Sequence, residues 1–180
     1  MFKIRYAKIE KNSVANGPGI RVVLWCQGCT LHCPGCHNQS TWSFSDGSIF
    51  DDSALEEIYT ELNKDYVDGI TFSGGHPLEP ENFIDCLYIA LNIKQKYPTK
   101  TIWLYTGLTL NYKHFSRYHS FGCRGQNKML SHLLNLCDVV VDGPYIESER
   151  DLTLKFRGSR NQRLIDVKET LKQGKIITLE

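Results

Sequence analysis

The chain has 180 residues, enough for one domain with its own hydrophobic core, and we expect residues 1–180 to form a single domain. Hydrophobic residues make up 41% of it, and no apolar run approaches the roughly 18 residues of a membrane span, so we expect a soluble globular protein. The formal net charge of +1 gives no overall attraction to nucleic acid or to an anionic membrane, and we expect neither as a partner.

Cysteine usage points to a reducing compartment. The chain has seven cysteines, an odd number, and three of them cluster within eight residues, which argues against the disulfide framework of a secreted scaffold. The N-terminus carries a charge at every second position and lacks the apolar stretch of a secretory signal. We therefore expect a cytoplasmic protein.

The first predicted element is a strand over residues 20–25, which runs directly into a cysteine-rich loop at residues 29–37. The loop contains Cys29, Cys33 and Cys36, and thiolates are the natural ligands of iron-sulfur clusters and of zinc. Three cysteines on a 4Fe-4S cluster leave one iron open to a small molecule. Loops at the carboxyl ends of strands are where α/β folds place ligands, so position and chemistry agree.

A structural zinc site is the alternative for the same loop. Cys26 would be the fourth ligand, since Cys26 with Cys29 and Cys33 with Cys36 form two knuckle-like pairs. Zinc ribbons usually separate such pairs by about 15 to 20 residues, whereas three residues separate them here. Spacing alone leaves this alternative open, although Cys26 ends an apolar strand, where a free cysteine is most often a packing residue.

Strands and helices alternate after the loop. A capping box at Ser53 and Glu56 predicts a helix over about 53–65, followed by a strand at 69–72. Ser73, Gly74, Gly75, His76 and Pro77 then form a second candidate ligand loop, because glycine lets backbone approach a ligand and proline ends the strand.

The alternation continues with a predicted helix over about 81–96 and a strand over 101–105. Residues 111–127 have no clean period and are interpreted as a loop or insertion; a helix around Leu130 to Cys137 and a buried strand over 138–144 follow. Such alternation indicates an α/β fold with parallel strands and right-handed crossovers, here an incomplete (βα) barrel with the cysteine loop at its C-terminal rim.

The cysteine spacing resembles the cluster motif of the radical S-adenosylmethionine (SAM) enzymes. Further motifs narrow the resemblance to the activating proteins of anaerobic (class III) ribonucleoside-triphosphate reductase, and it covers roughly residues 16–167. These motifs are Asn-Gly-Pro-Gly-Ile-Arg at 16–21, Gly-Cys-His-Asn at 35–38, Thr-Trp at 41–42, Ser-Gly-Gly at 73–75 and Phe-Arg-Gly-Ser at 156–159 with Asn-Gln at 161–162.

The resemblance implies the same partial barrel, a 4Fe-4S cluster held by Cys29, Cys33 and Cys36, and SAM chelated to the open iron. It places SAM against Gly35, Cys36, His37 and Gly75, with the chemistry carried by cluster and SAM and with no catalytic side chain. The implied activity is reductive cleavage of SAM to generate a glycyl radical on the large reductase subunit, with flavodoxin or ferredoxin as electron donor. An activase of another glycyl radical enzyme, such as pyruvate formate-lyase, is the nearest alternative; a non-catalytic zinc-binding interaction module is a more distant one.

Two features of the chain bear on this resemblance. The family carries an acidic residue after the two glycines, where this chain has His76, and we expect His76→Asp to keep or tighten SAM binding because a carboxylate accepts hydrogen bonds from an ammonium group.

The segment 149–175 carries eight Lys and Arg against four Asp and Glu, a local charge of +4. We predict that it helps to dock the reductase.

Overall fold

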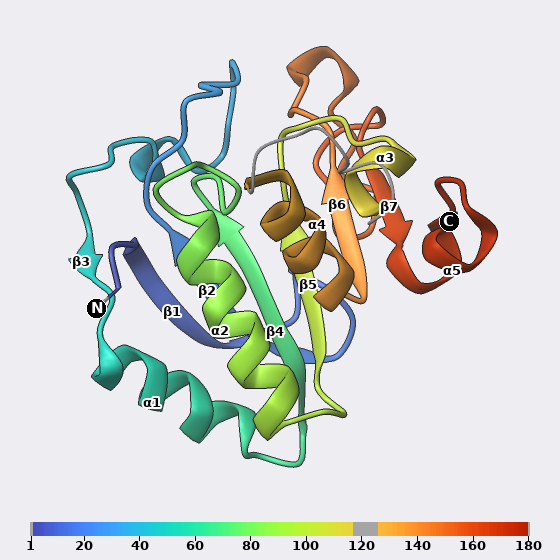
Figure 1. The fold of residues 1–180 in the computed structure, drawn as a ribbon. Coiled ribbons are helices and arrows are strands. Elements are labelled where there is room, and N and C mark those ends of the chain that lie inside the picture. Colours follow the sequence, from blue (N-terminus) through green and yellow to red (C-terminus); the bar gives the residue numbers. More distant parts are fainter. Residues whose placement is uncertain (1, 117–125, 180) are drawn as a thin grey trace.

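The computed structural model of the chain describes residues 2–116 and 126–179. Their strands form one eight-stranded sheet in the order β3-β1-β2-β4-β5-β6-β7-β8 (Figure 1). The four central strands pair in parallel: β2 (Ile20–Cys26), β4 (Val67–Gly74), β5 (Thr101–Tyr105) and β6 (Val139–Asp142). The outer strands pair antiparallel: β1 (Arg5–Ser13), β3 (Ser48–Ile49), β7 (Arg163–Asp166) and β8 (Thr178–Leu179).

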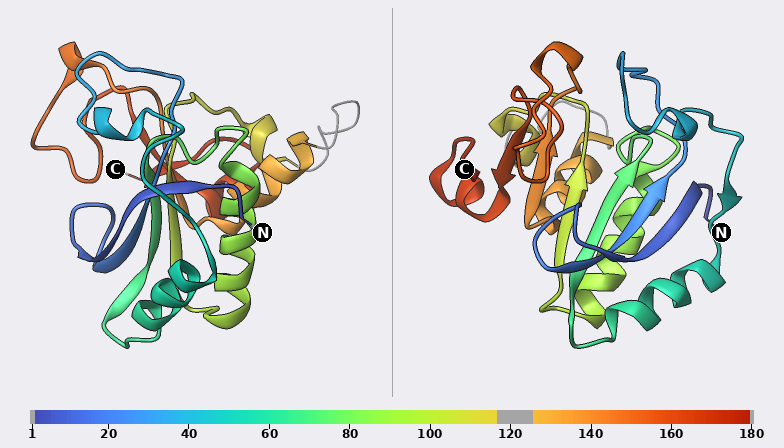
Figure 2. Two further views of the ribbon diagram at one scale, coloured as in Figure 1. Left: turned by 90° about the vertical axis from the view of Figure 1, so that its left-hand side faces the viewer. Right: turned by 180° about the vertical axis from the view of Figure 1, so that it is seen from behind.

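The larger helices lie on one face of this sheet, as the turned views show (Figure 2). Segments without long helices cross the other face. This mixed sheet with a parallel centre confirms the predicted α/β class; the closer assignment to an incomplete barrel stays a prediction. The helices are α1 (Asp52–Leu62), α2 (Phe83–Lys96), α3 (Tyr112–Phe115), α4 (Gln126–Leu136) and α5 (Val167–Gln173), with short 3-10 turns η1 (Gln39–Thr41) and η3 (Glu147–Glu149).

The alternation of side chains along the strands creates two buried layers. In β5, Ile102 and Leu104 join the main core beneath the helices, while Trp103 between them faces a smaller cluster with Val139, Val141 and Leu164. The main core is the larger of the two because all five α-helices of the described residues contribute to it.

Arg21 is fully buried on the face away from the helices and joins three strands. Its Nε donates to the Thr71 hydroxyl (2.8 Å) and its Nη1 to the Thr101 hydroxyl (2.8 Å), while Nη2 donates to backbone carbonyls of the same two strands. The guanidinium also lies 5.6 Å from the ring centre of Trp103. Burial lowers its pKa to about 10, but hydrogen bonding leaves none of its nitrogens without an acceptor.

Several predicted boundaries shift in the structure. The strand predicted at 69–72 spans Val67–Gly74, and the helix predicted at 53–65 is α1, which ends at Leu62. The predicted capping box at Ser53 was wrong: Asp51 caps the helix, because its side chain accepts a hydrogen bond from the Ala54 N–H (2.9 Å).

The segment 111–127 is not wholly a loop. Asn111 caps the single-turn helix α3, with His114 completing a capping box, and α4 begins at Gln126. Residues 117–125, in the middle of that prediction, lie outside the described residues. Within the described ranges, no helix is both long and apolar enough to cross a lipid bilayer.

Candidate functional site

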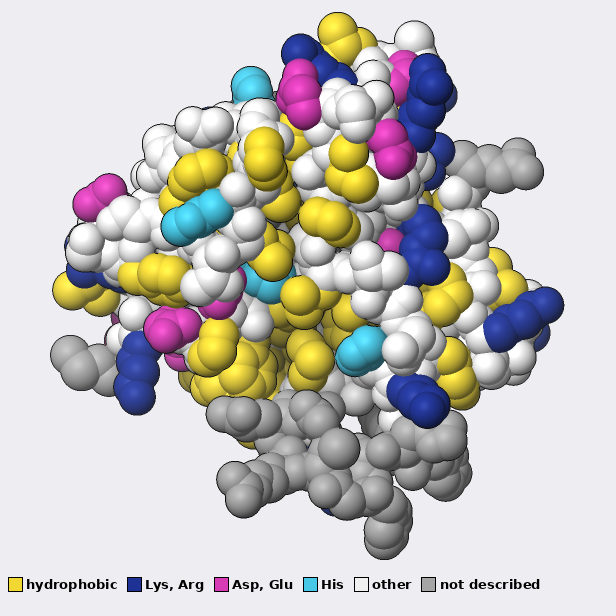
Figure 3. All heavy atoms as spheres, turned by 90° about the horizontal axis from the view of Figure 1, so that it is seen from above, with side chains coloured by type: hydrophobic (Ala, Val, Ile, Leu, Met, Phe, Trp, Pro, Cys, Tyr) yellow, Lys and Arg dark blue, Asp and Glu magenta, His cyan; other side chains and the backbone are white. Residues whose placement is uncertain are grey.

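The cysteine loop follows β2 at the edge of the sheet where the parallel strands end, as predicted (Figure 1). Two backbone hydrogen bonds fix its start: the Gly28 N–H donates to the Thr41 carbonyl (2.8 Å) and the Cys29 N–H to the Trp42 carbonyl (3.0 Å). Seen from above, hydrophobic side chains, with cysteine counted among them, gather near the middle of this edge with histidines between them (Figure 3).

Cys29, Cys33 and Cys36 line one cavity of about 260 Å³. Cys29 is buried and the other two are partly exposed. Burial raises the pKa of the Cys29 thiol, although nearby backbone N–H groups oppose the shift, so a metal must displace a proton on binding. The Asn38 N–H points at the Cys36 sulfur (3.4 Å), as N–H groups do toward cluster thiolates.

The donors around the cavity are of the kind that a 4Fe-4S cluster takes. Among the described residues, no three His, Cys, Asp or Glu side chains are grouped closely enough to bind one metal ion. Each cysteine of a cluster binds a different iron, so three thiols spread around one cavity fit that group.

Cys26, the fourth ligand of the zinc alternative, lies elsewhere. It is fully buried in the main core, where its sulfur is 3.9 Å from the sulfur of Cys86. Burial raises the pKa of Cys86 well above its usual range, and Cys137 is buried in the same core. These contacts fit the packing role predicted for Cys26, and Cys86 and Cys137 pack in the same core; Cys123 lies outside the described residues.

The cavity wall opposite the cysteines comes from the ends of β4, β5 and β6. Gly75 lies there, and its backbone N–H donates to the Cys26 carbonyl (2.8 Å). A side chain at Gly75 would collide with the carbonyl of Gly28, so only glycine fits between the two loops. Cys36 and His37 also line this cavity, so three of the four predicted SAM-contacting residues come together.

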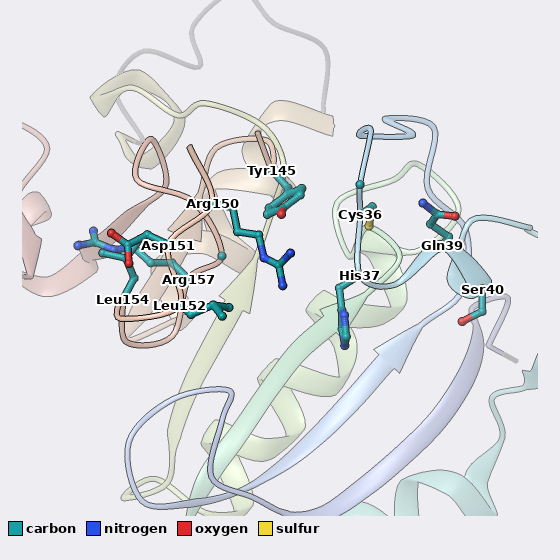
Figure 4. Close-up of a pocket in the computed structure, with 12 residues that line it drawn as sticks. Cys36, His37, Gln39, Ser40, Tyr145, Arg150, Asp151, Leu152, Leu154 and Arg157 are labelled. Carbon is teal, nitrogen blue, oxygen red and sulfur yellow. The ribbon is translucent and has the colours of Figure 1, made fainter. Parts of the chain in front are cut away.

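Gly35, the fourth of these residues, lies on a neighbouring groove of about 710 Å³ (Figure 4). Its φ of 74° is in the left-handed region, and a side chain there would meet the Glu147 carboxylate. Cys36, His37, Tyr145 and Gly158 line both hollows, which makes them continuous.

The far side of the groove belongs to the segment after β6. Arg150 points across it toward the side that carries His37 (Figure 4). Arg157, Leu152 and Leu154 line the same wall, and Leu152 is 83% exposed. Cationic and apolar side chains thus stand together beside the cysteine loop.

Other strand-end residues divide into two groups. Tyr105 and Thr106, which the sequence marks only as strand ends, line the cavity. Asp142 does not: it is fully buried, forms an ion pair with Arg163 and accepts a hydrogen bond from the Leu110 N–H (2.7 Å). Its role is structural.

Several residues of the cavity wall were not predicted from the sequence. Trp25, Asn38, Tyr145 and Gln162 reach the cavity from three different loops or strands. Asn38 and Gln162 belong to motifs that carry the family resemblance, and that was the available signal. For Trp25 and Tyr145 the position at a strand end was the only signal.

His76 lies behind the cavity and not in it. Its ring is buried between Glu79 and Thr106, with Nδ1 3.1 Å from Glu79 Oε1 and Nε2 2.7 Å from the Thr106 hydroxyl. Burial lowers the pKa of His76, so the ring is neutral at pH 7. Burial raises the pKa of Glu79, but hydrogen bonds from Thr30 and His76 outweigh it, and the net shift is downward.

Comparison with known proteins agrees with this geometry. The model of a protein family described as a 4Fe-4S single cluster domain matches residues 15–165. Anaerobic ribonucleoside-triphosphate reductase-activating proteins from Enterobacteria phage T4, Vibrio cholerae and Escherichia coli K12 are 37%, 37% and 35% identical to this chain. These alignments cover 88–89% of this chain and 93–96% of the relatives. The chain therefore belongs to the family of anaerobic ribonucleoside-triphosphate reductase-activating proteins.

Proposed function

We propose that this protein activates anaerobic ribonucleoside-triphosphate reductase by reductive cleavage of SAM. The observation that carries the proposal is the cavity itself: the three cysteines of the loop and the glycine loop after β4 line it together. The family membership supports the same activity. The proposal places the protein in the cytoplasm, where thiols stay reduced, and assigns its sheet to the partial barrel of the radical SAM enzymes.

In this proposal Cys29, Cys33 and Cys36 hold the cluster, and SAM lies against Gly35, Cys36, His37 and Gly75. When bound, the cluster and SAM would supply the one-electron chemistry that cleaves SAM and generates a glycyl radical on the reductase. The electron comes from a low-potential donor such as flavodoxin or ferredoxin.

The chain's own residues position and enclose the ligand. Gly75 lets the glycine loop pack against the Gly28 carbonyl of the cysteine loop, and Gly35 adopts a left-handed φ beside the Glu147 carboxylate, so a side chain at either position would disturb the wall. Tyr105, whose hydroxyl donates to the Phe156 carbonyl (2.8 Å), ties the end of β5 to the segment that forms the outer wall. This hydrogen bond fixes the position of the outer wall relative to the strand end.

The groove that continues the cavity is the proposed place of the reductase. A glycine of another protein has to reach the ligand, and Cys36, His37, Tyr145 and Gly158 face both hollows. Holding two proteins in register is what such a surface contributes to the rate.

The test is an anaerobic assay with separate substrates. Protein reconstituted with iron and sulfide should bind about four irons and, once reduced, release 5'-deoxyadenosine from SAM. Added reductase should gain the electron paramagnetic resonance doublet of a glycyl radical. Pyruvate formate-lyase, in a parallel sample, should gain none. A doublet on pyruvate formate-lyase alone would assign the protein to that enzyme, and one colourless zinc per chain without nucleoside product would reject the proposal.

A further inference from the structure

A chain of hydrogen-bonded polar groups connects the cysteine loop with the opposite wall of the cavity. At one end is Thr30, the neighbour of Cys29, whose backbone N–H and hydroxyl both donate to Glu79 Oε1 (2.8 Å each). His76 continues from the same oxygen to the hydroxyl of Thr106 at the end of β5. His76, Glu79 and Thr106 are 4%, 5% and 4% exposed, so solvent does not compete for the two bonds of the His76 ring, whereas Thr30 itself is exposed.

The partners fix where the protons are. Glu79 is an acceptor only, so Nδ1 of His76 carries the proton and donates to it. In a neutral ring Nε2 is then an acceptor, and the Thr106 hydroxyl has to donate to it. The Thr106 oxygen also accepts from the Leu108 N–H (3.2 Å) and keeps a second lone pair for a further donor.

Thr106 lines the cavity, as Gly75 does, and its hydroxyl bonds to His76, which lies behind that wall with Glu79. The backbone of His76 is fixed as well. Its N–H donates to the Gly28 carbonyl (2.8 Å), and the Asn82 side chain donates to its carbonyl (3.0 Å). Ring and backbone therefore move with the two loops that enclose the cavity.

We propose that His76 is a positioning residue for SAM: held by Glu79, it turns the Thr106 hydroxyl so that its oxygen accepts a hydrogen bond from the ammonium group of the ligand. Glu79 thereby takes the place of the carboxylate that the family carries directly after the glycines. It acts on the ligand indirectly, through the imidazole of His76 and the hydroxyl of Thr106. The inference rests on the proposed function, since it presupposes that SAM binds in this cavity.

The first test measures the dissociation constant of SAM on the cluster-loaded, oxidised protein by anaerobic calorimetry. Thr106→Val removes the hydroxyl at constant shape, and His76→Asn keeps a donor for Glu79 but is too short to reach Thr106. Each should weaken SAM binding about tenfold, the effect of one hydrogen bond to a charged group. The double variant should be no weaker than either single one, because both remove the same contact.

Two conservative variants serve as controls for that experiment. Thr106→Ser keeps the hydroxyl, and the amide of His76→Gln reaches as far as the distal ring nitrogen, so both should recover most of the affinity. Iron content is measured in every sample. Should His76→Asn lose iron, Thr106→Val remains the decisive variant, because Thr106 lies at the end of the chain of bonds that is farthest from Cys29.

The second test introduces the family's acidic residue as His76→Asp. For this variant the structure predicts a change in SAM affinity opposite to the one expected from the sequence. His76→Asp would place a second carboxylate beside Glu79 in a buried site, so it should weaken SAM binding instead of keeping or tightening it. The double variant His76→Asp/Glu79→Gln should bind more tightly than the single one, since the Gln amide donates to Asp while its oxygen still accepts from Thr30.

The outcomes separate the two proposals. Wild-type protein that holds about four irons yet binds no SAM would reject the proposed function. Wild-type protein that binds SAM, with unchanged affinity in Thr106→Val and His76→Asn, would overturn the positioning role alone. Additive losses of SAM affinity in the double variant Thr106→Val/His76→Asn would also overturn it. So would tighter SAM binding in His76→Asp.

Discussion

At the scale of the residue, the role of a cysteine in this protein depends on which face of its element it occupies. Cys26 is the last residue of β2, and its side chain points to the helices, where Cys86 contacts it. Cys29 is three residues further on, past the edge of the sheet, and lines the cavity with Cys33 and Cys36. Three residues along the chain thus separate Cys26, a packing thiol, from Cys29, a thiol that lines the cavity.

Replacing these cysteines one at a time tests that separation. Cys29→Ala, Cys33→Ala and Cys36→Ala should each lose the cluster, because two thiols hold a cubane poorly. Cys26→Ala should keep about four irons and lose only a little stability, the cost of a small gap in the core. Iron and sulfide analysis after anaerobic reconstitution gives the answer. Loss of iron in Cys26→Ala as complete as in Cys33→Ala would show that Cys26 is a ligand.

The sequence could predict that these cysteines act together because they lie within eight residues of one another. The chain from Glu79 through His76 to Thr106 could not be predicted, since the histidine and its threonine partner are thirty residues apart and meet only once β4 and β5 pair. The sequence showed His76 as a departure from a pattern. Only the fold shows that the carboxylate of Glu79 forms a hydrogen bond with the His76 ring.

At the scale of the element, Asp138 joins three neighbours at the start of β6. Its carboxylate accepts from the Ile102 N–H (2.9 Å) of β5, from Lys94 (2.8 Å) of α2 and from Lys168 (3.0 Å) of α5. Burial raises its pKa, but these three donors outweigh burial, and the net shift is downward.

Asp138→Asn should therefore lower the free energy of unfolding at pH 7 by about 1–3 kcal/mol, the range for hydrogen bonds to a buried charged group. Because the folded-state pKa is lowered, this contribution is present above the unfolded pKa of about 3.9 and is lost as pH falls through the folded value. Urea denaturation between pH 7 and pH 3 measures it, and the difference from wild type should shrink below about pH 4.

Glu169→Gln is the matched control, since it breaks the exposed pair with Lys172. It should change the free energy of unfolding by less than about 1 kcal/mol. An effect of Asp138→Asn no larger than this control would show that Asp138 does not join the elements.

The strands of the centre were predictable and those of the edges were not. Residues 101–105 form the predicted strand because a strand buried on both faces is a continuous apolar run. β1 was not predicted from the sequence. Its residues are half-buried and exposed in alternating pairs, and its register with β2 shifts twice, so its side chains show no period of two. β7 and α5 follow one another directly at Asp166, which caps the helix, and their short lengths give weak periodic signals.

At the scale of the whole molecule, the positive segment 149–175 divides into two parts. Arg150 and Arg157 line the groove beside the cysteine loop, and Arg160, 72% exposed, forms an ion pair with Asp151 on the same wall. Lys168 and Lys172 instead belong to α5. The predicted docking surface therefore narrows to residues 150–160.

Association with the reductase should weaken as salt rises through about 0.1 M, where charges are screened over roughly 10 Å. Arg157→Ala and Arg160→Ala should lower the rate of glycyl radical formation several-fold, while SAM cleavage without the reductase stays unchanged. Lys172→Ala, with the same loss of charge on α5, is the control and should behave as wild type. Equal losses in all three variants would point to net charge, and no loss in any of them would remove the segment from the interface.

The outer edges of the sheet also affect how readily the protein aggregates. Among the described strands β3 pairs only with Arg5 and Tyr6, so β1 from Ala7 to Ser13 is an open edge; this stretch carries Lys8 and Lys11, and its register with β2 shifts twice. Long flat edges are templates on which chains aggregate by strand addition, and lysines and bulges along an edge suppress it. At the high concentrations needed for anaerobic spectroscopy, we therefore expect this edge of β1 not to join chains by strand addition.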